Sequence, residues 1–279
     1  MLIPFTKMQG TGNDFIILNQ LDVDYGLSKE VIEKLASRQY GIGFDQLLII
    51  ENSSNPKAEF KYRIFNADGN EVEQCGNGAR CFFQYIIDKK LSTNSSIVVE
   101  TKSGLITLKY NANKLVEVNM GEPIFNYEDI PFIPNNEKLR IKIDGTLVDI
   151  NVISMGNPHA VIKIDDFNQC DIKQISESLQ NSPQFPKSVN VGFLKTIDKN
   201  TIRLKVYERG SGLTLACGTG ACAAAVIAIS QKWVANPVCV EMDGGRLTIN
   251  WHDQKDVILM GPAQIVFEGE INLDKFIDD

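Results

Sequence analysis

The sequence predicts an α+β protein of two pseudo-symmetric domains that arose by internal duplication, each with a mainly antiparallel or mixed sheet curled around one central buried helix. Glycine-rich turns at Cys75 and Cys217 each lead into a long helical segment. The sequence around the first turn recurs around the second. Between the helices, short strand-like segments follow one another too closely for most connections to be parallel crossovers. These three observations together predict the fold class.

The second glycine-rich turn opens a segment, residues 215–232, that is apolar on nearly every face. A helix without a polar face is usually buried. The backbone N–H groups of Gly218, Thr219 and Gly220 would lie at its N-terminus, where unpaired donors and the helix dipole favour an anion. We therefore expect Cys217, placed at the same end, to tend toward the thiolate.

The same arrangement occurs at residues 74–90, where Cys75 precedes Cys217 by 142 residues. Other corresponding pairs lie 140 to 144 residues apart: Asn13 and Asn157, Glu100 and Glu241, Gly104 and Gly245, and Met120 and Met260. A nearly constant separation indicates an internal repeat. We predict one domain over residues 1–122, to which 268–279 returns, and a second over 123–267.

The length and charge of the chain limit the kinds of protein and partner that the sequence is compatible with. With 279 residues and 43% hydrophobic content, each half can bury a core of its own. The net charge of −7 argues against nucleic acid or an anionic membrane as the main partner. We expect a small-molecule partner, no nucleic acid and no membrane, and we leave a homodimer open.

The cysteines and the N-terminus predict a cytoplasmic protein. The first residues show neither the basic region nor the long apolar run of a signal peptide, and no segment reaches transmembrane length. Six cysteines without an export signal are typical of reduced thiols. Their spacing is not that of zinc ligands, and the chain has only two histidines, so we expect no metal.

In the first half, strands are predicted at 3–8, 15–18, 46–50, 58–65, 97–101, 105–110 and 115–120. The polar turn between the first two strands lacks the third glycine of a dinucleotide-binding motif. Ser28 can cap a helix that we expect to continue to Tyr40, stop at Gly41 and lie on an outer face.

Residues 121–136 contain three prolines and little periodicity, so we predict that they form the crossing between the domains. The second half then repeats the order of the first. It is predicted to contain strands at 152–154, 160–164 and 202–207, and a helix at about 172–179.

If an approximate twofold axis relates the halves, the two helix starts face each other across one cleft. A carboxylate bound by the amides of both turns would then hold its α-carbon between the sulfur atoms of Cys75 and Cys217. One thiolate could remove a proton from one face of this carbon while the other thiol protonates the opposite face. Such a reaction inverts the stereocentre.

The chain resembles the diaminopimelate epimerase family along its whole length. The motifs that carry the resemblance are MQGTGNDF (8–15), GIGFDQ (41–46), FNADG (65–69), CGNGAR (75–80), GNPH (156–159), SVNVGF (188–193), YERG (207–210) and ACGTG (216–220). The resemblance implies two similar domains, each a barrel-like sheet around a central helix. It also implies the cofactor-independent interconversion of LL- and meso-diaminopimelate, in lysine and peptidoglycan precursor synthesis.

The resemblance assigns roles to individual residues. It implies that Cys75 and Cys217 are the acid/base pair. The reacting carboxylate would be held by Gly76, Asn77, Gly218 and Thr219. The rest of the substrate would be held by Asn13, Gln46, Asn66, Asn157, Asn190, Glu208 and Arg209. The residues that tune the thiols would be His159 and Glu208.

Two positions depart from the family pattern: Gln9 stands where histidine is common, and Leu213 where glutamate is common. Neither residue carries proton chemistry in the family, so the implied reaction class is unchanged. Three other functions stay open. They are a related isomerase of the same fold acting on proline or a similar acid, a non-catalytic carboxylate- or phosphate-binding protein, and a pyridoxal enzyme, although no lysine stands out near either turn.

Overall fold

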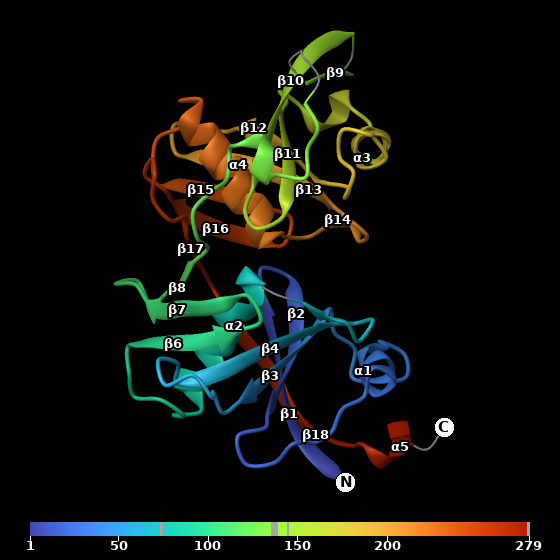
Figure 1. Ribbon diagram of the computed structural model, residues 1–279, viewed down its shortest axis with the longest axis vertical. Coiled ribbons are helices and arrows are strands. Elements are labelled where there is room, and N and C mark those ends of the chain that lie inside the picture. Colours follow the sequence, from blue (N-terminus) through green and yellow to red (C-terminus); the bar gives the residue numbers. More distant parts are fainter. Residues whose placement is uncertain (73–74, 135–138, 144, 278–279) are drawn as a thin grey trace. The chain divides into compact units, whose positions relative to one another are not determined.

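The computed structural model describes residues 1–72, 75–134, 139–143 and 145–277 (Figure 1). Its contacts divide the chain into two compact units, one of Met1–Val118 with Gly261–Asp279 and the other of Asn119–Met260. Each unit combines a mixed β-sheet with a few helices, which confirms the α+β class. The domain limits predicted at residues 122 and 267 stay a prediction.

In the first unit, consecutive hydrogen-bonded strands are β18 (Gln264–Asn272), β1 (Leu2–Gly10), β2 (Asn13–Asn19), β3 (Gln46–Glu51), β4 (Phe60–Asn66), β6 (Ser96–Thr101), β7 (Gly104–Tyr110) and β8 (Val116–Asn119). Neighbours are antiparallel except β2–β3 and β4–β6, which are parallel. The short β5 (Glu71–Val72) pairs antiparallel with the other end of β4.

The second unit contains, in order of pairing, β9 (Arg140–Ile143), β10 (Thr146–Ser154), β11 (Pro158–Lys163), β12 (Asn190–Thr196), β13 (Thr201–Glu208), β15 (Val238–Met242), β16 (Gly245–Asn250) and β17 (Ile258–Gly261). The parallel neighbours are β11–β12 and β13–β15, and β14 (Gly212–Thr214) pairs antiparallel with β13. From β10 to β17, the pairings therefore have the same order and directions as those from β1 to β8.

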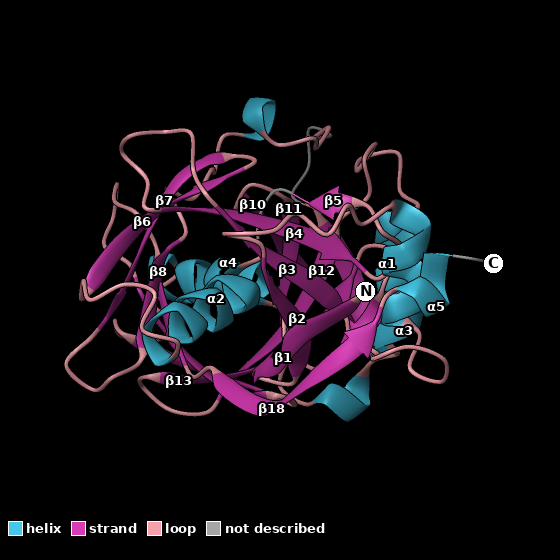
Figure 2. Ribbon diagram, turned by 90° about the horizontal axis from the view of Figure 1, so that it is seen from below, coloured by secondary structure: helices cyan, strands magenta, loops and turns pink. Residues whose placement is uncertain are grey.

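A central helix lies against the sheet of each unit. In the first, α2 (Gly76–Asp88) contacts β1, β2, β3, β7 and β18, and Figure 2 shows it among these strands. In the second, α4 (Gly218–Ser230) contacts β10 to β13, β15 and β16. Every residue from Gly220 to Ala228 is buried, which confirms the prediction of a helix without an exposed face.

Close packing explains the glycines at the third position of both central helices. A Cβ atom on Gly78 would lie 2.4 Å from the hydroxyl oxygen of Tyr62, and one on Gly220 would lie 2.9 Å from Cγ2 of Val206. Both distances are shorter than a side chain can tolerate, so only glycine lets each helix start rest directly on its neighbours.

A second helix covers the outer face of each sheet. In the first unit, α1 (Lys29–Ala36) packs Val31 and Leu35 into a core with residues of β1, β2 and β3. In the second, α3 (Ile172–Gln180) packs Ile175 in the same way against β10, β11 and β12.

The last helix that the structure describes is the short α5 (Asp274–Ile277). Over the described ranges, no helix has the length and apolar character needed to span a membrane.

The cap of α1 was predicted correctly, because the Ser28 side chain accepts a hydrogen bond from the Val31 backbone N–H at 3.3 Å. The predicted end at Tyr40 is wrong, since the helix ends at Ala36. The chain turns back at this point, and the Leu35 carbonyl accepts the N–H groups of Ile42 and Gly43. These bonds replace those that would continue the helix.

Residues 121–134 do more than cross between the units. Ile124 forms a β-bridge with Ser154, and both Ile130 and Phe132 are buried in the core of the second unit. The prediction that this segment only crosses between the domains is therefore corrected: residues 121–134 pack as part of the second unit. Residues 135 and 136 lie outside the described residues. The hairpin β9–β10 was predicted only at residues 152–154, although Val148, Ile150 and Val152 alternate with the polar Asp149 and Asn151 as expected for a strand.

Candidate active site

The predicted site residues of the first unit lie at neighbouring element ends: the starts of β2 and β3, the end of β4 and the start of α2. In the register of these strands, Gln46 is beside Phe15 of β2 and opposite Asn66 of β4. The residues at these positions are Asn13, Gln46, Asn66, Cys75, Gly76 and Asn77.

Gln46 and Asn66 form a polar pair at this strand edge. The Gln46 Nε2 atom donates a hydrogen bond to Oδ1 of Asn66 at 2.8 Å. The Gln46 Oε1 atom is buried and has no hydrogen-bond partner among the residues that the structure describes. A buried acceptor without a partner is costly, so this oxygen is suited to accept a hydrogen bond from a bound ligand.

Cys75 is the residue that precedes the first turn of α2. Its sulfur accepts a hydrogen bond from the Gly78 backbone N–H at 3.3 Å, and its thiol donates a long hydrogen bond to Oδ1 of Asn13 at 3.9 Å. The same Asn13 oxygen accepts a hydrogen bond from Nδ2 of Asn77 at 3.4 Å. One of the backbone donors at the helix start is thus directed at the sulfur, as expected for this position.

In the second unit, the predicted residues occupy the corresponding places: around the start of β11, at the start of β12, at the end of β13 and at the start of α4. The parallel register places His159 beside Asn190. The residues at these positions are Asn157, His159, Asn190, Glu208, Arg209, Cys217, Gly218 and Thr219.

Hydrogen bonds connect most of these side chains. The Asn157 amide pairs through Oδ1 with Nε2 of His159 at 3.0 Å and donates through Nδ2 to the Thr219 hydroxyl at 3.4 Å. The Arg209 backbone N–H donates to Oδ1 of Asn190 at 2.9 Å. The structure therefore brings the predicted residues of each half together within one unit.

Cys217 is buried and donates its thiol hydrogen to Oε2 of Glu208 at 3.0 Å. The Thr214 hydroxyl donates to the other carboxylate oxygen of Glu208 at 2.6 Å. Burial, and then the negative charge of Glu208, raise the pKa of Cys217 well above its usual value. This direction is opposite to the thiolate tendency expected from the helix start, so Cys217 is a thiol in this arrangement.

The two cysteines therefore differ although their positions correspond. The Cys75 sulfur accepts a backbone N–H and donates to the neutral amide oxygen of Asn13, whereas the Cys217 thiol donates to the Glu208 carboxylate. The carboxylate beside Cys217 favours a protonated thiol, which suits a general acid, and the absence of a formal charge on the Asn13 amide and the Gly78 N–H makes Cys75 the better candidate for the base.

His159 is almost completely buried, at 1% exposure. Burial, and then the nearby charge of Arg209, lower the pKa of His159 to about 3. The imidazole is therefore neutral near pH 7. It can orient Asn157 through their hydrogen bond, but it does not supply a positive charge that would stabilise a thiolate.

Sequence reasoning missed Thr214, which anchors the Glu208 carboxylate. Its signal was the alternation along β14, where Leu213 is 52% exposed and Thr214 faces the other way. Leu213, one of the two residues that differ from the family pattern, therefore has an exposed side chain. The departure at Gln9 lies near the end of β1, where its side chain donates to that of Gln264 at 2.8 Å and accepts the Gly12 N–H at 3.1 Å.

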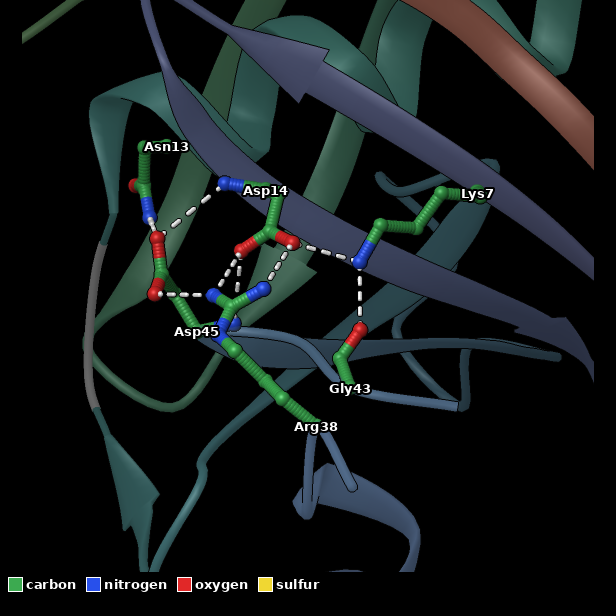
Figure 3. Close-up of polar contacts among 6 residues, drawn as sticks. All are labelled: Lys7, Asn13, Asp14, Arg38, Gly43 and Asp45. Carbon is green, nitrogen blue, oxygen red and sulfur yellow. Dashed lines mark hydrogen bonds and ion pairs between the residues drawn. The ribbon is translucent and has the colours of Figure 1, made fainter. Parts of the chain in front are cut away.

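A charged network that sequence reasoning also missed adjoins Asn13 (Figure 3). Arg38 donates to both carboxylate oxygens of Asp14, at 3.0 and 2.8 Å, and to Asp45 at 3.0 Å. Lys7 donates to Asp14 and to the Gly43 carbonyl. Burial alone would raise the pKa of Asp14, but the hydrogen bonds and charges of Arg38 and Lys7 outweigh it and lower the pKa to about 2.

We predict that Asp14→Asn lowers the free energy of unfolding by about 2 kcal/mol at pH 7. The folded-state pKa of Asp14 lies below the unfolded value, so its stabilisation is complete above about pH 5. It should fall to about half by pH 3, as the unfolded carboxyl becomes protonated. Urea denaturation of both proteins at pH 7, 4 and 3 measures the difference, and Asp22→Asn, at an exposed position, is the control. A difference that stays constant over this range would contradict the prediction.

Comparison with solved structures shows the fold. The chain is similar to a phenazine biosynthesis protein of the PhzF family from Bacillus anthracis, with a TM-score of 0.72, 19% identity, and coverage of 98% of this chain and 99% of that one. It is also similar to a hydroxyproline epimerase from Agrobacterium vitis, with a TM-score of 0.68, 12% identity, and coverage of 98% and 93%. At these identities, the likeness concerns the fold alone.

Comparison of sequences shows the family. The diaminopimelate epimerase family model matches residues 5–126 and 151–266. The chain is 48% identical over 276 residues to diaminopimelate epimerase of Pseudomonas fluorescens (strain Pf0-1), and 46% identical over 276 residues to that of Stutzerimonas stutzeri (strain A1501). Each alignment covers 98% of this chain and 100% of the relative. On the strength of these matches, the chain belongs to the diaminopimelate epimerase family and is an isomerase.

Proposed function

We propose that this protein interconverts LL-diaminopimelate and meso-diaminopimelate without a cofactor, through a thiolate at one cysteine and a thiol at the other. The observation that carries the proposal is the difference between two corresponding helix starts: the Cys217 thiol donates to the Glu208 carboxylate, whereas the Cys75 sulfur has a backbone N–H donor and the neutral Asn13 amide beside it. The names of its 46–48% identical relatives support the choice of substrate.

In the proposed reaction, the backbone N–H groups of Gly76, Asn77, Gly218 and Thr219 bind the reacting carboxylate. The Cys75 thiolate takes the proton from the α-carbon, and the Cys217 thiol donates its own proton to the opposite face. The product complex then holds a thiol at Cys75 and a thiolate at Cys217. One proton has been moved at each face, and the reverse reaction uses the same groups with exchanged roles.

Glu208 supports the role of Cys217 as the first proton donor. Its carboxylate accepts the thiol hydrogen at 3.0 Å and is itself held by Thr214. A thiolate at Cys217 would lie beside this negative charge, so the resting site favours the protonated form. In this proposal, Glu208 tunes Cys217 by charge, whereas neutral His159 acts by orienting Asn157.

The remaining polar side chains would hold the amino and carboxylate groups at both ends of the substrate. The buried Oε1 of Gln46, which lacks a partner among the described residues, supports a contact with a substrate ammonium group. Arg209 is exposed and could bind the distal carboxylate. The residues proposed to hold the substrate beyond its reacting carboxylate are Asn13, Gln46, Asn66, Asn157, Asn190, Glu208 and Arg209.

We also propose that the two units descend from one duplicated domain. The matching order of pairings from β1 to β8 and from β10 to β17 supports this origin. Backbone conformation supports it as well, because Lys90 and Lys232, which follow α2 and α4, have positive φ angles of 56° and 58°.

The function is tested by incubating the pure protein with LL-diaminopimelate in D₂O without any cofactor. We expect meso-diaminopimelate to form. Early product should carry solvent deuterium at the inverted carbon while unreacted substrate gains little, because a different thiol serves each face. Product that keeps the original hydrogen would contradict the two-base mechanism. Failure to form the meso isomer would show that LL-diaminopimelate is not the substrate. Parallel incubations with L-proline and trans-4-hydroxy-L-proline test the alternative isomerase.

A further inference from the structure

The amide side chains beside Cys75 form a hydrogen-bonded chain with one direction. The Arg80 guanidinium donates to Oδ1 of Asn77 at 3.0 Å, and Nδ2 of Asn77 donates to Oδ1 of Asn13 at 3.4 Å. Nδ2 of Asn13 then donates to Oδ2 of Asp45 at 2.7 Å. The chain thus begins at a buried cation, passes through two amides and ends at a carboxylate.

The two ends determine the direction of the chain. A guanidinium can only donate hydrogen bonds, and an ionised carboxylate can only accept them. The Asn77 amide must therefore direct its oxygen toward Arg80, and the Asn13 amide must direct its nitrogen toward Asp45. Both amides are held in one of their two orientations by charged groups outside the amides themselves.

This orientation determines which atom of Asn13 faces the sulfur. With its nitrogen held by Asp45, Asn13 presents Oδ1 to the Cys75 sulfur at 3.9 Å. Rotation of the Asn13 amide by half a turn would place an N–H donor beside the sulfur and against the donor group of Asn77. The environment of the Cys75 thiol thus depends on a carboxylate that does not itself contact the sulfur in this arrangement.

Asp45 is firmly held although its side chain is 45% exposed. Its Oδ1 accepts from Arg38 at 3.0 Å, and its Oδ2 also accepts the Asp14 backbone N–H at 3.2 Å (Figure 3). Its own backbone N–H donates to Oδ1 of Asp14 at 3.0 Å. Both carboxylate oxygens are therefore surrounded by donors, which fixes the group that Asn13 meets.

We propose that Asp45 is a positioning residue, which acts through Asn13 to set the hydrogen-bonding environment of Cys75. The kinetic consequence rests on the proposed epimerase function, whereas the effect on the thiol does not. Asp45→Ala removes the acceptor and frees the Asn13 amide, so kcat/KM for epimerisation should fall by roughly ten- to a hundredfold, as expected for a misplaced active-site group. Asp45→Asn keeps the shape and one acceptor oxygen, and it should restore part of the activity.

The control is Asp149→Ala in the second unit. Asp149 is 50% exposed and pairs with Arg140 at 2.7 Å, so this change removes a similarly exposed ion-paired carboxylate away from Asn13. It should leave kcat/KM near the wild-type value. Urea denaturation of both variants shows how much of any change comes from stability.

The decisive measurement is a double-mutant cycle with Asn13→Ala. If Asp45 acts through Asn13, Asp45→Ala should lower kcat/KM by less than about twofold once Asn13 is absent. A full-sized loss in the Asn13→Ala background would overturn the proposal, and so would an Asp45→Ala effect no larger than that of Asp149→Ala.

The rate of Cys75 alkylation by iodoacetamide at pH 7, followed by peptide mass spectrometry, tests the inference without diaminopimelate. A freed Asn13 amide can donate to the sulfur and favour its thiolate, so Asp45→Ala should speed alkylation, and Asn13→Ala should abolish this difference. An unchanged rate in Asp45→Ala would overturn the inference. If the wild-type protein fails to epimerise diaminopimelate, the proposed function fails, but this measurement still decides the role of Asp45.

Discussion

Cys75→Ser and Cys217→Ser should each lower kcat for epimerisation by about 10²–10⁴-fold, the usual contribution of one positioned acid or base. A serine hydroxyl is a far weaker acid than a thiol, so the variant can neither hold a reactive anion nor readily donate a proton at that face. The backbone N–H groups at both helix starts remain, so KM should change much less than kcat. Steady-state rates in both directions measure this split.

Hydrogen exchange in D₂O separates the roles of the two thiols. Each single variant keeps the other cysteine of the pair, which should still exchange the α-hydrogen on its own face without inverting the carbon. Cys239→Ser is the control, because it makes the same chemical change on β15, away from both helix starts. Near wild-type epimerisation by both Cys75→Ser and Cys217→Ser would disprove the proposed mechanism.

The central helices were predictable because their sequence carries two independent signals. The apolar character of α4 requires burial on all sides, and the glycines at its start are required by close contacts such as that between Gly220 and Val206. The repeat supplied the same prediction for α2. The grouping of site residues followed as well, because they stand at strand ends that the register of each sheet brings together.

The donor and acceptor roles within the site could not be predicted. Cys75 and Cys217 stand in nearly the same local sequence, yet the Cys217 thiol donates to a carboxylate at the end of β13, whereas the Cys75 thiol donates to the Asn13 amide at the start of β2. The residue of the first unit that corresponds to Glu208 is Asn66, which pairs with Gln46 instead. These contacts depend on side chains that meet through tertiary packing, and the local helix-start rule does not include them.

The errors in secondary structure have a similar cause. The end of α1 depends on a turn in which the Leu35 carbonyl bonds to Ile42 and Gly43, and the residues up to Tyr40 have no strong helix breaker. The burial of Ile130 and Phe132 depends on a core formed by later strands. In both places, contacts between separate segments overrode the local pattern.

Glu208→Gln should lower the pKa of Cys217 and reduce epimerisation by about 10²-fold, because it removes the charge that keeps this thiol protonated. The substitution keeps the size of the side chain. The Thr214 hydroxyl donates to Oε1 of Glu208 at 2.6 Å, so a glutamine would turn its oxygen toward Thr214 and its nitrogen toward the sulfur. A donor would then replace an acceptor beside Cys217, and both changes favour the thiolate.

The pH dependence of Cys217 alkylation measures this effect directly. The thiolate is the reactive form, so the rise in alkylation rate should move to lower pH in Glu208→Gln than in the wild-type protein. Glu241→Gln is the control, since that carboxylate pairs with Arg246 on the neighbouring strand and should leave the profile unchanged. An unchanged or higher midpoint in Glu208→Gln would mean that burial alone keeps Cys217 protonated. In that case Glu208 would act on the substrate and not on the thiol, and any loss of epimerisation would appear in KM more than in kcat.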